Sequence, residues 1–357
     1  MYKNLIALLG ATLFALSVQA QSASAPTRAA WIYVTPVTDT GWTRQHELGR
    51  QAVEKAFGAD VQTRYVADVA EGPDAERVLR ELAREGHDII FTTSFGYMEP
   101  ALKVAHEFPD VKFEVITGVK RAPNVATANA RYYEGRYLSG VAAGLMSESN
   151  MVGYVAGFPI PEIISSINAF TLGLRSVKPA ATVRLIWLNE WYNPSREREA
   201  AMTLMDQGAD VLAFNSASTA VMRAAQERGK LAIAYHSDMR SVAPDAQLAA
   251  VTHHWGDYDV NRIRALREGR WTSTDLWGGV AEGMVRIEAF GPKVPQGVHM
   301  QVLERQQDIA AGRLHPFAGP VTDNQGQLQI AGGETASDEH ILTMNYLVKG
   351  VQGQLPR

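Results

Sequence analysis

The sequence predicts a doubly wound α/β protein made of two lobes, and three observations lead to this fold class. Short runs of β-forming residues alternate with helical segments over most of the chain, which is the pattern of strand–helix–strand units. Most of these runs are almost wholly apolar, as in strands buried on both faces of a parallel sheet. The alternation pauses over residues 131–145 and begins again at Met151, so we expect two similar halves joined by a hinge.

Nine runs are predicted as strands because they are short, apolar and rich in β-formers. They are residues 30–34, 61–65, 88–93, 112–117, 151–156, 182–188, 211–214, 231–235 and 248–252. Eight amphipathic segments between them are predicted as helices. They are residues 43–57, 74–85, 97–107, 134–147, 161–177, 195–207, 219–228 and 258–267. Pro161 and Pro194 suit a first helical turn, and glycines such as Gly208 stand where helices are expected to end.

The predicted domain boundaries follow from these elements. Residues 28–130 and about 255–290 are assigned to the first lobe, and residues 131–254 to the second. Residues 291–357 are expected to form a C-terminal helix, a hairpin around 323–326 and a segment that crosses between the lobes. A chain of 357 residues exceeds what one hydrophobic core usually supports, which also favours two domains.

The first residues have the pattern of a cleaved secretory signal peptide. Lys3 precedes an apolar run over residues 5–18, and small residues end at Ala20. Residues 21–27 are polar and small, so we expect a linker there and not the continuation of a buried helix. The chain contains no cysteine, so we expect no lipid anchor after cleavage. Together these features predict a periplasmic protein.

Composition narrows the classes of partner. The chain carries 34 Lys and Arg against 38 Asp and Glu, and neither sign gathers into long runs. Nucleic acid and anionic membrane surfaces are therefore poor partner candidates. No P-loop and no Gly-x-Gly-x-x-Gly segment follows a predicted strand, so we expect no nucleotide cofactor. We expect a monomer that binds a small molecule.

The candidate binding residues follow the predicted strands. Ligands of open parallel sheets bind beyond the carboxyl ends of the strands, and aromatic and polar side chains gather at those positions. The candidates are Trp42, Thr43, Ser94, Phe95, Thr117, Gly118, Phe158, Asn189, Glu190, Trp191, Asn215, His236, Asp238 and Trp255. Several aromatic rings with a few polar groups predict a pocket for a flat ligand. Any one tryptophan could instead fill a domain interface, and Glu190 or Asp238 could be a solvated loop charge.

Several segments resemble the basic membrane protein (BMP) family of solute-binding proteins, whose best understood branch is the purine nucleoside receptors. No single segment is diagnostic, but together they cover nearly the whole chain in the right order. They are TDTGWT at 38–43, YEGRYLSGVAAGL at 133–145, VGYVAG at 152–157, DQGADV at 206–211 and MNYLVKGV at 344–351.

The resemblance implies a type I periplasmic-binding-protein fold that serves an ABC importer and its membrane permease. Receptors of this family hold a purine between two aromatic rings, one from each lobe. Trp42 and Trp191 match those two positions, and Thr43 stands where a base-contacting Asn is usual. The resemblance implies a binding role with no catalysis and no cofactor. Hinge closure around the ligand would complete the sandwich.

Three departures from the family pattern concern the sugar of a nucleoside. His236 stands in place of a ribose-binding acidic residue, His254-Trp255 in place of a lysine, and Thr117-Gly118 in place of an acidic pair. Trp255 would fill space and remove donors, so we hypothesise that the ligand is a free purine base or a related heterocycle. Asn189, Glu190, Asn215 or His236 would then contact the ring edge.

Two other classes of function stay open. His236, Asp238, His253 and His254 could converge as zinc ligands of a periplasmic hydrolase. However, the chain has no His-Glu-x-x-His helix, no Cys pair and no Gly-x-Ser-x-Gly elbow. A sensor partner that presents its ligand to a membrane receptor would use the same fold.

Overall fold

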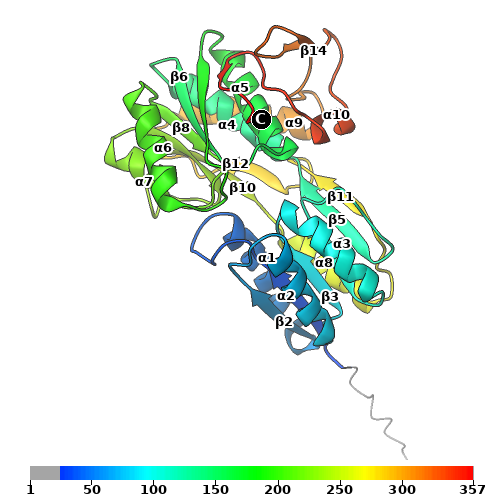
Figure 1. The fold of residues 1–357 in the computed structure, drawn as a ribbon. Helices are drawn as coiled ribbons and strands as arrows, with labels where there is room; N and C mark the ends of the chain where they lie inside the picture. The colour runs from blue at the N-terminus through cyan, green and yellow to red at the C-terminus, as the bar shows by residue number, and fades with distance from the viewer. Residues whose placement is uncertain (1–24, 357) are drawn as a thin grey trace, which may run out of the picture.

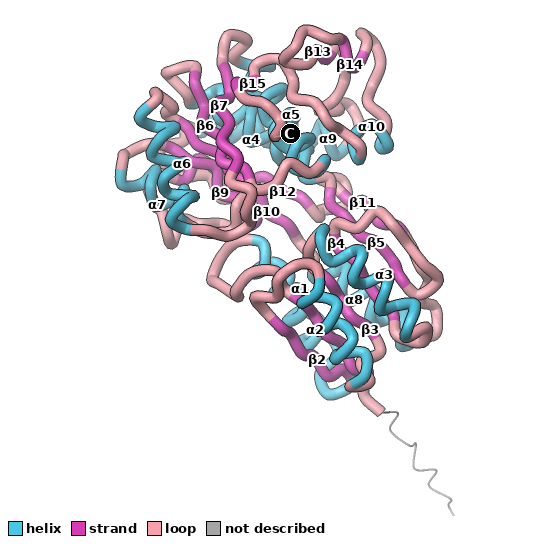
Figure 2. Tube along the Cα trace, in the orientation of Figure 1, coloured by secondary structure: helices cyan, strands magenta, loops and turns pink. Residues whose placement is uncertain are grey.

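The computed structural model describes residues 25–356, and these residues form two α/β lobes arranged end to end (Figures 1 and 2). The expected signal peptide and most of the expected linker lie outside the described residues. Within residues 25–356, no helix is both long and apolar enough to span a membrane.

The first lobe is a six-stranded sheet in the order β11-β5-β4-β3-β1-β2, and all its strand pairs are parallel. Its strands are β1 (Thr27–Ile32), β2 (Val61–Val66), β3 (Ile89–Thr92), β4 (Lys112–Ile116), β5 (Val125–Ala130) and β11 (Asp275–Gly278). Its helices are α1 (Trp42–Phe57), α2 (Pro73–Arg84), α3 (Met98–Glu107) and α8 (Gly256–Arg267). The central strands β1, β3, β4 and β5 are almost wholly buried, as expected for a sheet covered by helices.

The second lobe is a seven-stranded sheet in the order β12-β10-β9-β8-β6-β7-β15. Its strands are β6 (Met151–Ala156), β7 (Thr182–Trp187), β8 (Val211–Phe214), β9 (Leu231–His236), β10 (Gln247–His253), β12 (Val285–Glu288) and β15 (Val351–Gln352). Its helices are α4 (Tyr132–Met146), α5 (Pro161–Val177), α6 (Pro194–Asp206), α7 (Ala220–Glu227) and α9 (Gln296–Ala310). Only β12, which pairs with β10, runs antiparallel to its neighbour.

Two glycines allow α4 and α5 to pack with their backbones in close contact. A Cβ on Gly140 would lie 2.0 Å from the carbonyl oxygen of Phe170, and a Cβ on Gly173 would lie 2.0 Å from that of Tyr137. Neither glycine has space for a side chain. This pair of helices covers one face of the second sheet and includes α4, the first segment to leave the other lobe (Figure 1).

The domain boundary expected at about residue 290 is wrong in one respect. β11 belongs to the first sheet, but β12 pairs with β10 in the second. The chain therefore returns to the second lobe between residues 278 and 285. The C-terminal segment, expected to cross between the lobes, instead adds to the second lobe: β15 pairs with β7, and α9 packs on α4.

The hairpin expected around residues 323–326 is present as β13 (Val321–Thr322) and β14 (Leu328–Ile330), which pair antiparallel. It is followed by α10 (Asp338–Leu342), which packs against α5. Arg131, at the start of the first passage between the lobes, forms an ion pair of 2.9 Å with Asp338 of α10. The C-terminal segment thus also contacts the hinge region.

Candidate functional site

One pocket, called the main pocket below, is lined by residues of both lobes and lies where the order of the strands reverses in each sheet. In the first sheet the chain order reverses between β1 and β3, and in the second between β6 and β8. The loops at such a reversal diverge and leave a crevice beyond the carboxyl ends of the strands. The pocket draws its lining from those loops in both lobes, together with the ends of β7 and β9.

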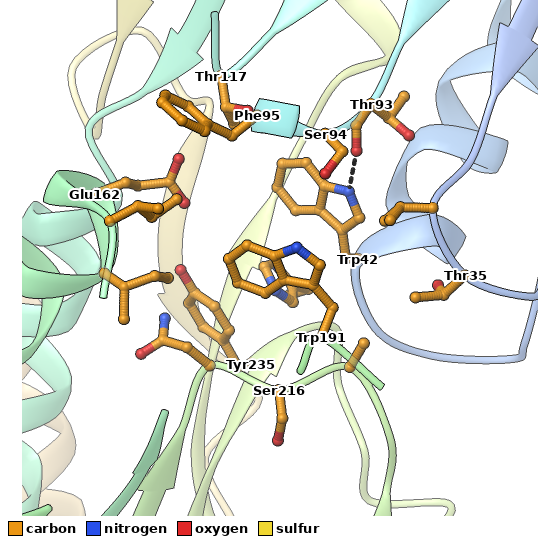
Figure 3. Close-up of a pocket in the computed structure, with 16 residues that line it drawn as sticks. Thr35, Trp42, Thr93, Ser94, Phe95, Thr117, Glu162, Trp191, Ser216 and Tyr235 are labelled. Carbon is orange, nitrogen blue, oxygen red and sulfur yellow. Dashed lines mark hydrogen bonds between the residues drawn. The ribbon is translucent and has the colours of Figure 1, made fainter. Parts of the chain in front are cut away.

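The pocket encloses about 510 Å³ of free space, part of it open to solvent. Figure 3 shows the side chains that surround it. Its lining residues are Val34, Thr35, Trp42, Thr93, Ser94, Phe95, Thr117, Ile160, Glu162, Ile163, Trp191, Asn215, Ser216, Ala217, Tyr235 and His236. Half of these residues are aliphatic or aromatic and half carry polar side chains, but most of the surface that they expose to the pocket is apolar.

Trp42 is the first residue of α1, and its ring orientation is set by contacts on several sides. Its indole Nε1 donates to the carbonyl oxygen of Thr93 at 2.7 Å (Figure 3). The ring of His46, one turn along the helix, meets it edge-on at 4.4 Å, and His236 of the second lobe does so at 5.2 Å. Trp255 packs at right angles to it at 6.5 Å. The indole is therefore held before any ligand binds.

Trp191 reaches the same pocket from the second lobe, in the loop that follows β7. Phe158 packs edge-on against its ring at 4.9 Å. A Cβ on Gly157 would lie 2.8 Å from Cε3 and 2.9 Å from Cζ3 of the indole, so this position accepts only glycine without moving the ring. The indole Nε1 is buried, and no described residue accepts a hydrogen bond from it.

Glu162 places a carboxyl group at the edge of the pocket. It lies in the first turn of α5, directly after Pro161, and Figure 3 shows its carboxyl group on the same side of the pocket as Phe95. Within residues 25–356, no cation or hydrogen-bond donor contacts its carboxylate oxygens. Burial raises the pKa of Glu162 to about 8, because charge is costly away from water. This half-buried side chain therefore favours its protonated form near neutral pH.

A buried cluster of aromatic and basic side chains forms the floor of the pocket. His236 and His253 share a hydrogen bond of 2.8 Å between their Nδ1 atoms, so one of these nitrogens carries a proton and the other does not. Burial, as the largest cause, holds the pKa of both histidines well below the usual value. The guanidinium of Arg136, which is fully buried, lies 3.3 Å from the ring centre of Tyr235 and donates to the carbonyl oxygen of Phe214.

Three polar atoms in the lining residues are buried and have no hydrogen-bond partner among the described residues. They are Trp191 Nε1, Asn215 Nδ2 and the hydroxyl of Tyr235. The other side-chain atom of Asn215, Oδ1, accepts from the hydroxyl of Tyr154. Buried polar groups are nearly always paired, so three such donors in one pocket indicate a surface suited to ligand acceptors.

Two lining residues have a strained backbone. Thr117 and His236 have φ angles of 64° and 67°, in the left-handed region that non-glycine residues seldom adopt. Both stand at or just beyond the carboxyl end of a strand. For the β-branched Thr117 the cost is of the order of 1–3 kcal/mol. Strain of this kind is typical of ligand-binding loops.

The two lobes touch through direct hydrogen bonds beside the pocket. Ser237 of the second lobe accepts from the backbone N–H of Gly41 at 3.0 Å and from Nε2 of Gln45 at 2.7 Å. The Gly41 backbone has a φ of 90°, and a Cβ there would lie 3.1 Å from the carbonyl oxygen of Ala217. The described conformation is therefore one in which the lobes are in contact around the pocket.

Seven of the fourteen residues predicted from the sequence line the pocket: Trp42, Ser94, Phe95, Thr117, Trp191, Asn215 and His236. Three others lie directly behind this lining. Thr43 is buried and shares a hydrogen bond of 2.6 Å with Thr35. Phe158 supports Trp191, and Trp255 is 1% exposed and packs against His46 and Trp42. These three position other side chains and do not form the pocket wall.

The remaining four lie away from the pocket, for different reasons. The carboxylate of Glu190 pairs with Arg196 and accepts from Asn193, and that of Asp238 forms an ion pair of 2.6 Å with Arg240. The backbone of Asn189 turns its side chain into solvent. A Cβ on Gly118 would meet Val115 and Thr127, so this glycine permits close packing within the first lobe.

Nine lining residues are not among those predicted from the sequence, and Glu162 and Tyr235 are the most informative of them. Tyr235 is the last residue of the predicted strand 231–235 and was therefore not counted among the residues beyond the strand ends. The sequence did indicate the position of Glu162. An acid in the first turn of the helix that follows β6 lies at the carboxyl end of that strand, where ligands bind. Acids are also common at helix starts because they interact favourably with the helix dipole. Glu162 was therefore interpreted as an ordinary helix-start residue and not as a residue of the pocket.

The four side chains considered as zinc ligands do not converge. His236 bonds to His253, whereas Asp238 pairs with Arg240 and His254 lies beside Thr252 and Glu288. Across residues 25–356, no group of three or more His, Cys, Asp or Glu side chains is arranged to hold a metal ion.

Comparison with known proteins is consistent with this geometry. Residues 27–314 match the family described as ABC transporter substrate-binding protein, PnrA-like (Bmp). A purine-binding protein of Brucella abortus is 44% identical over 327 residues, which is 92% of this chain and 93% of that protein. A protein of Haloferax volcanii named as an ABC transporter glucose-binding protein is 37% identical over 92% of this chain and 81% of its own.

Solved structures agree on the fold. An ABC transporter solute-binding protein from Aeropyrum pernix superposes with a TM-score of 0.70 at 19% identity, covering 81% of this chain and 93% of that one. One from Conexibacter woesei superposes with a TM-score of 0.66 at 21% identity, covering 81% and 98%. The fold is therefore the type I periplasmic-binding-protein fold: two doubly wound parallel-sheet lobes joined by a hinge.

Proposed function

This chain belongs to the PnrA-like (Bmp) family of ABC transporter substrate-binding proteins, and we propose that it captures a purine nucleobase between Trp42 and Trp191. A small-molecule ligand and a membrane permease follow from the family. The observation that carries the proposal is that one tryptophan from each lobe lines the same pocket. Stacking on an aromatic face contributes about 1–3 kcal/mol per base, so two faces account for a large part of a micromolar affinity.

The polar groups of the pocket match the edge of a purine. Asn215 Nδ2 and the Tyr235 hydroxyl are buried donors without a partner among the described residues, and a purine offers several ring nitrogens as acceptors. Glu162 in its neutral form both donates and accepts. It pairs in two hydrogen bonds with adenine, through a ring nitrogen and the exocyclic amine, and equally with hypoxanthine, through the ring N–H and the carbonyl.

Glu162 is the group in this pocket whose ionisation would control binding. Its titratable neighbours are Tyr132 and Tyr235, whose pKa values burial raises far above neutrality. The histidines on the floor are neutral because their pKa values are lowered, and Arg136 lies behind the ring of Tyr235. Near neutral pH a ligand would therefore meet uncharged groups.

We further propose that the site prefers a base to its nucleoside. Trp255 stands where the similar nucleoside receptors carry a sugar-binding lysine, and its buried ring packs against Trp42 and His46. Its ring fills space behind the pocket wall, where the aliphatic chain and ammonium group of a lysine would otherwise lie. His236 replaces the acidic residue that would bind ribose hydroxyls and is engaged with His253.

The rest of the proposal concerns where and how the protein works. We propose that it is exported by a cleaved signal peptide, is free of a lipid anchor and acts as a periplasmic monomer. Ligand capture would be followed by delivery to the permease with no chemical change. Presentation of the ligand to a membrane sensor uses the same closed form and is separated from transport by identifying the membrane partner.

Isothermal titration calorimetry of the purified mature chain tests the ligand class. The panel is adenine, hypoxanthine, guanine, their nucleosides and glucose, which covers both ligand types named for the relatives. We expect the bases to bind and Trp191→Ala to lose about 1–3 kcal/mol of that affinity. The matched control is Trp187→Ala, since this tryptophan is the last residue of β7 and donates to the carbonyl oxygen of Gln354 outside the pocket. Tighter binding of nucleosides or glucose than of bases would refute the proposal.

A further inference from the structure

A second chamber adjoins the main pocket at the hinge. It has about 590 Å³ of free space, part of it open to solvent. Phe95, Thr117, Ile160 and Glu162 line both spaces, so these four side chains form the boundary between them. In Figure 3 the labelled members of this boundary stand together at one side of the main pocket, away from Thr35. A ligand in the main pocket therefore faces the second chamber across Glu162.

The walls of the second chamber come from both lobes and are mainly apolar. Val119 and Trp277 belong to the first lobe, and Ile341 and Leu342 of α10 to the second. Val119 is 54% exposed, so the chamber opens to solvent beside it. Nε1 of Trp277 donates to the carbonyl oxygen of Ala130 at 3.1 Å, which leaves the indole ring as a hydrophobic surface.

Two polar groups in the second chamber lack partners. Asn129 is 7% exposed, and its Oδ1 accepts from the backbone N–H of Ala130 at 2.9 Å, but no described residue accepts from its Nδ2. The hydroxyl of Tyr132 is buried, and no described residue bonds to it. The chamber is thus a largely apolar space with two hydrogen-bonding groups, which is the composition of a small-molecule subsite.

We propose that the second chamber holds an apolar alkyl or aryl substituent on the exocyclic nitrogen of a purine whose ring lies between Trp42 and Trp191. This inference rests on the proposed function and extends it to N-substituted purines. Its geometry follows from Glu162 at the boundary. A secondary exocyclic amine keeps one N–H, which donates a hydrogen bond to Glu162. The bond from this nitrogen to the substituent then passes beside the carboxyl group and points into the chamber. Burial of the substituent against apolar walls offsets the cost of ordering it.

A ligand series tests the chemistry. Calorimetric titrations with the mature chain compare adenine, N6-benzyladenine and N6,N6-dimethyladenine. We expect N6-benzyladenine to bind at least as tightly as adenine. We expect N6,N6-dimethyladenine to bind about tenfold more weakly or worse, because it has no N–H for Glu162 to accept. Adenine that binds while N6-benzyladenine does not would overturn this inference and leave the proposed function intact. If no purine binds, both fall.

A substitution at the mouth of the chamber tests the location. Val119 lines the second chamber but not the main pocket, and its exposure makes Val119→Trp compatible with folding. The indole should narrow the chamber and weaken N6-benzyladenine about tenfold, with adenine unchanged. Leu328→Trp is the matched control, since Leu328 is 62% exposed and lines neither space. Equal effects of Val119→Trp on both ligands, or none on either, would place the substituent elsewhere.

Discussion

Gly157 gives the sharpest test of the role of Trp191, because it changes the position of the indole without removing it. In Gly157→Ala the new Cβ would lie 2.8 and 2.9 Å from two ring carbons of Trp191. Carbon atoms in contact prefer about 3.5–4.0 Å, so the ring has to move by about 0.7 Å. The φ angle of Gly157 is ordinary for any residue, and the effect is therefore purely steric.

The expected loss of affinity follows from that displacement. A radial gap of about 0.5–1 Å forfeits about a quarter to a half of the dispersion attraction between two surfaces. If one stacking face contributes about 1–3 kcal/mol, Gly157→Ala should lose about 0.25–1.5 kcal/mol. The dissociation constant for adenine should then rise about 1.5- to 12-fold. Trp191→Ala, which removes the whole face, sets the upper limit.

Calorimetric titration with adenine measures this loss, and Gly297→Ala is the matched control. Gly297 lies in α9, has an ordinary φ angle, and a Cβ there would meet no atom within 4 Å. The Gly297→Ala protein should bind adenine with the same affinity as the wild type. A Gly157→Ala protein that melts like the wild type and binds adenine with unchanged affinity would refute the reasoning, because the ring would then not need its present position.

Three further perturbations have defined outcomes. Wild-type affinity for adenine should be constant below about pH 8, the pKa of Glu162, and should fall about tenfold per pH unit above it as the carboxyl loses the proton it donates. In titrations across that range Glu162→Gln should remove the pH dependence. Ser237→Ala, which removes the contacts of 3.0 and 2.7 Å to the first lobe, should weaken adenine binding by about 0.5–1.5 kcal/mol in calorimetry, with an unchanged melting temperature. Gly140→Ala puts a Cβ 2.0 Å from a carbonyl oxygen of α5 and should cost about 1–3 kcal/mol or more of unfolding free energy in urea.

Each of these results has a counterpart that would contradict it. A Glu162→Gln protein with the same loss of affinity at high pH would show that another group titrates. Weaker binding by Ser237→Ala together with a lower melting temperature would indicate general destabilisation instead of easier opening of the lobes. A stable Gly140→Ala protein would mean that α4 and α5 separate at little cost.

The fold was largely predictable because its strands have a strong local signal. All nine predicted strands are present, and the eight predicted helices match within a few residues. β5 was missed because three of its six residues, 125–130, are alanine and one is Asn, and both residue types are depleted in strands. β12 was assigned to the wrong lobe because four residues do not reveal their partner strand. Pairing between distant strands is a property of the assembled sheet.

The site was predictable only in part, for a different physical reason. Position after a strand identified Trp42 and Trp191, because the ends of parallel strands share one edge. It did not show whether a charged residue there already has a partner. Glu190 and Asp238 are neutralised by arginines close in sequence, whereas Glu162 has no cation beside it. Whether a carboxyl group is free depends on neighbours in space, which the order of residues does not give.

The charge state of the pocket argues for the kind of ligand it selects. The three titratable side chains in its lining are Glu162, Tyr235 and His236, and burial shifts each pKa in the direction that leaves the group neutral near pH 7. The nearby cation, Arg136, lies behind the ring of Tyr235 and donates to a backbone carbonyl. A phosphate or carboxylate placed here would be buried without a counter-charge in contact, at a cost of several kcal/mol. A neutral flat ring meets no such cost and gains both stacking faces. The same burial that makes the walls attractive to a base therefore excludes its nucleotide.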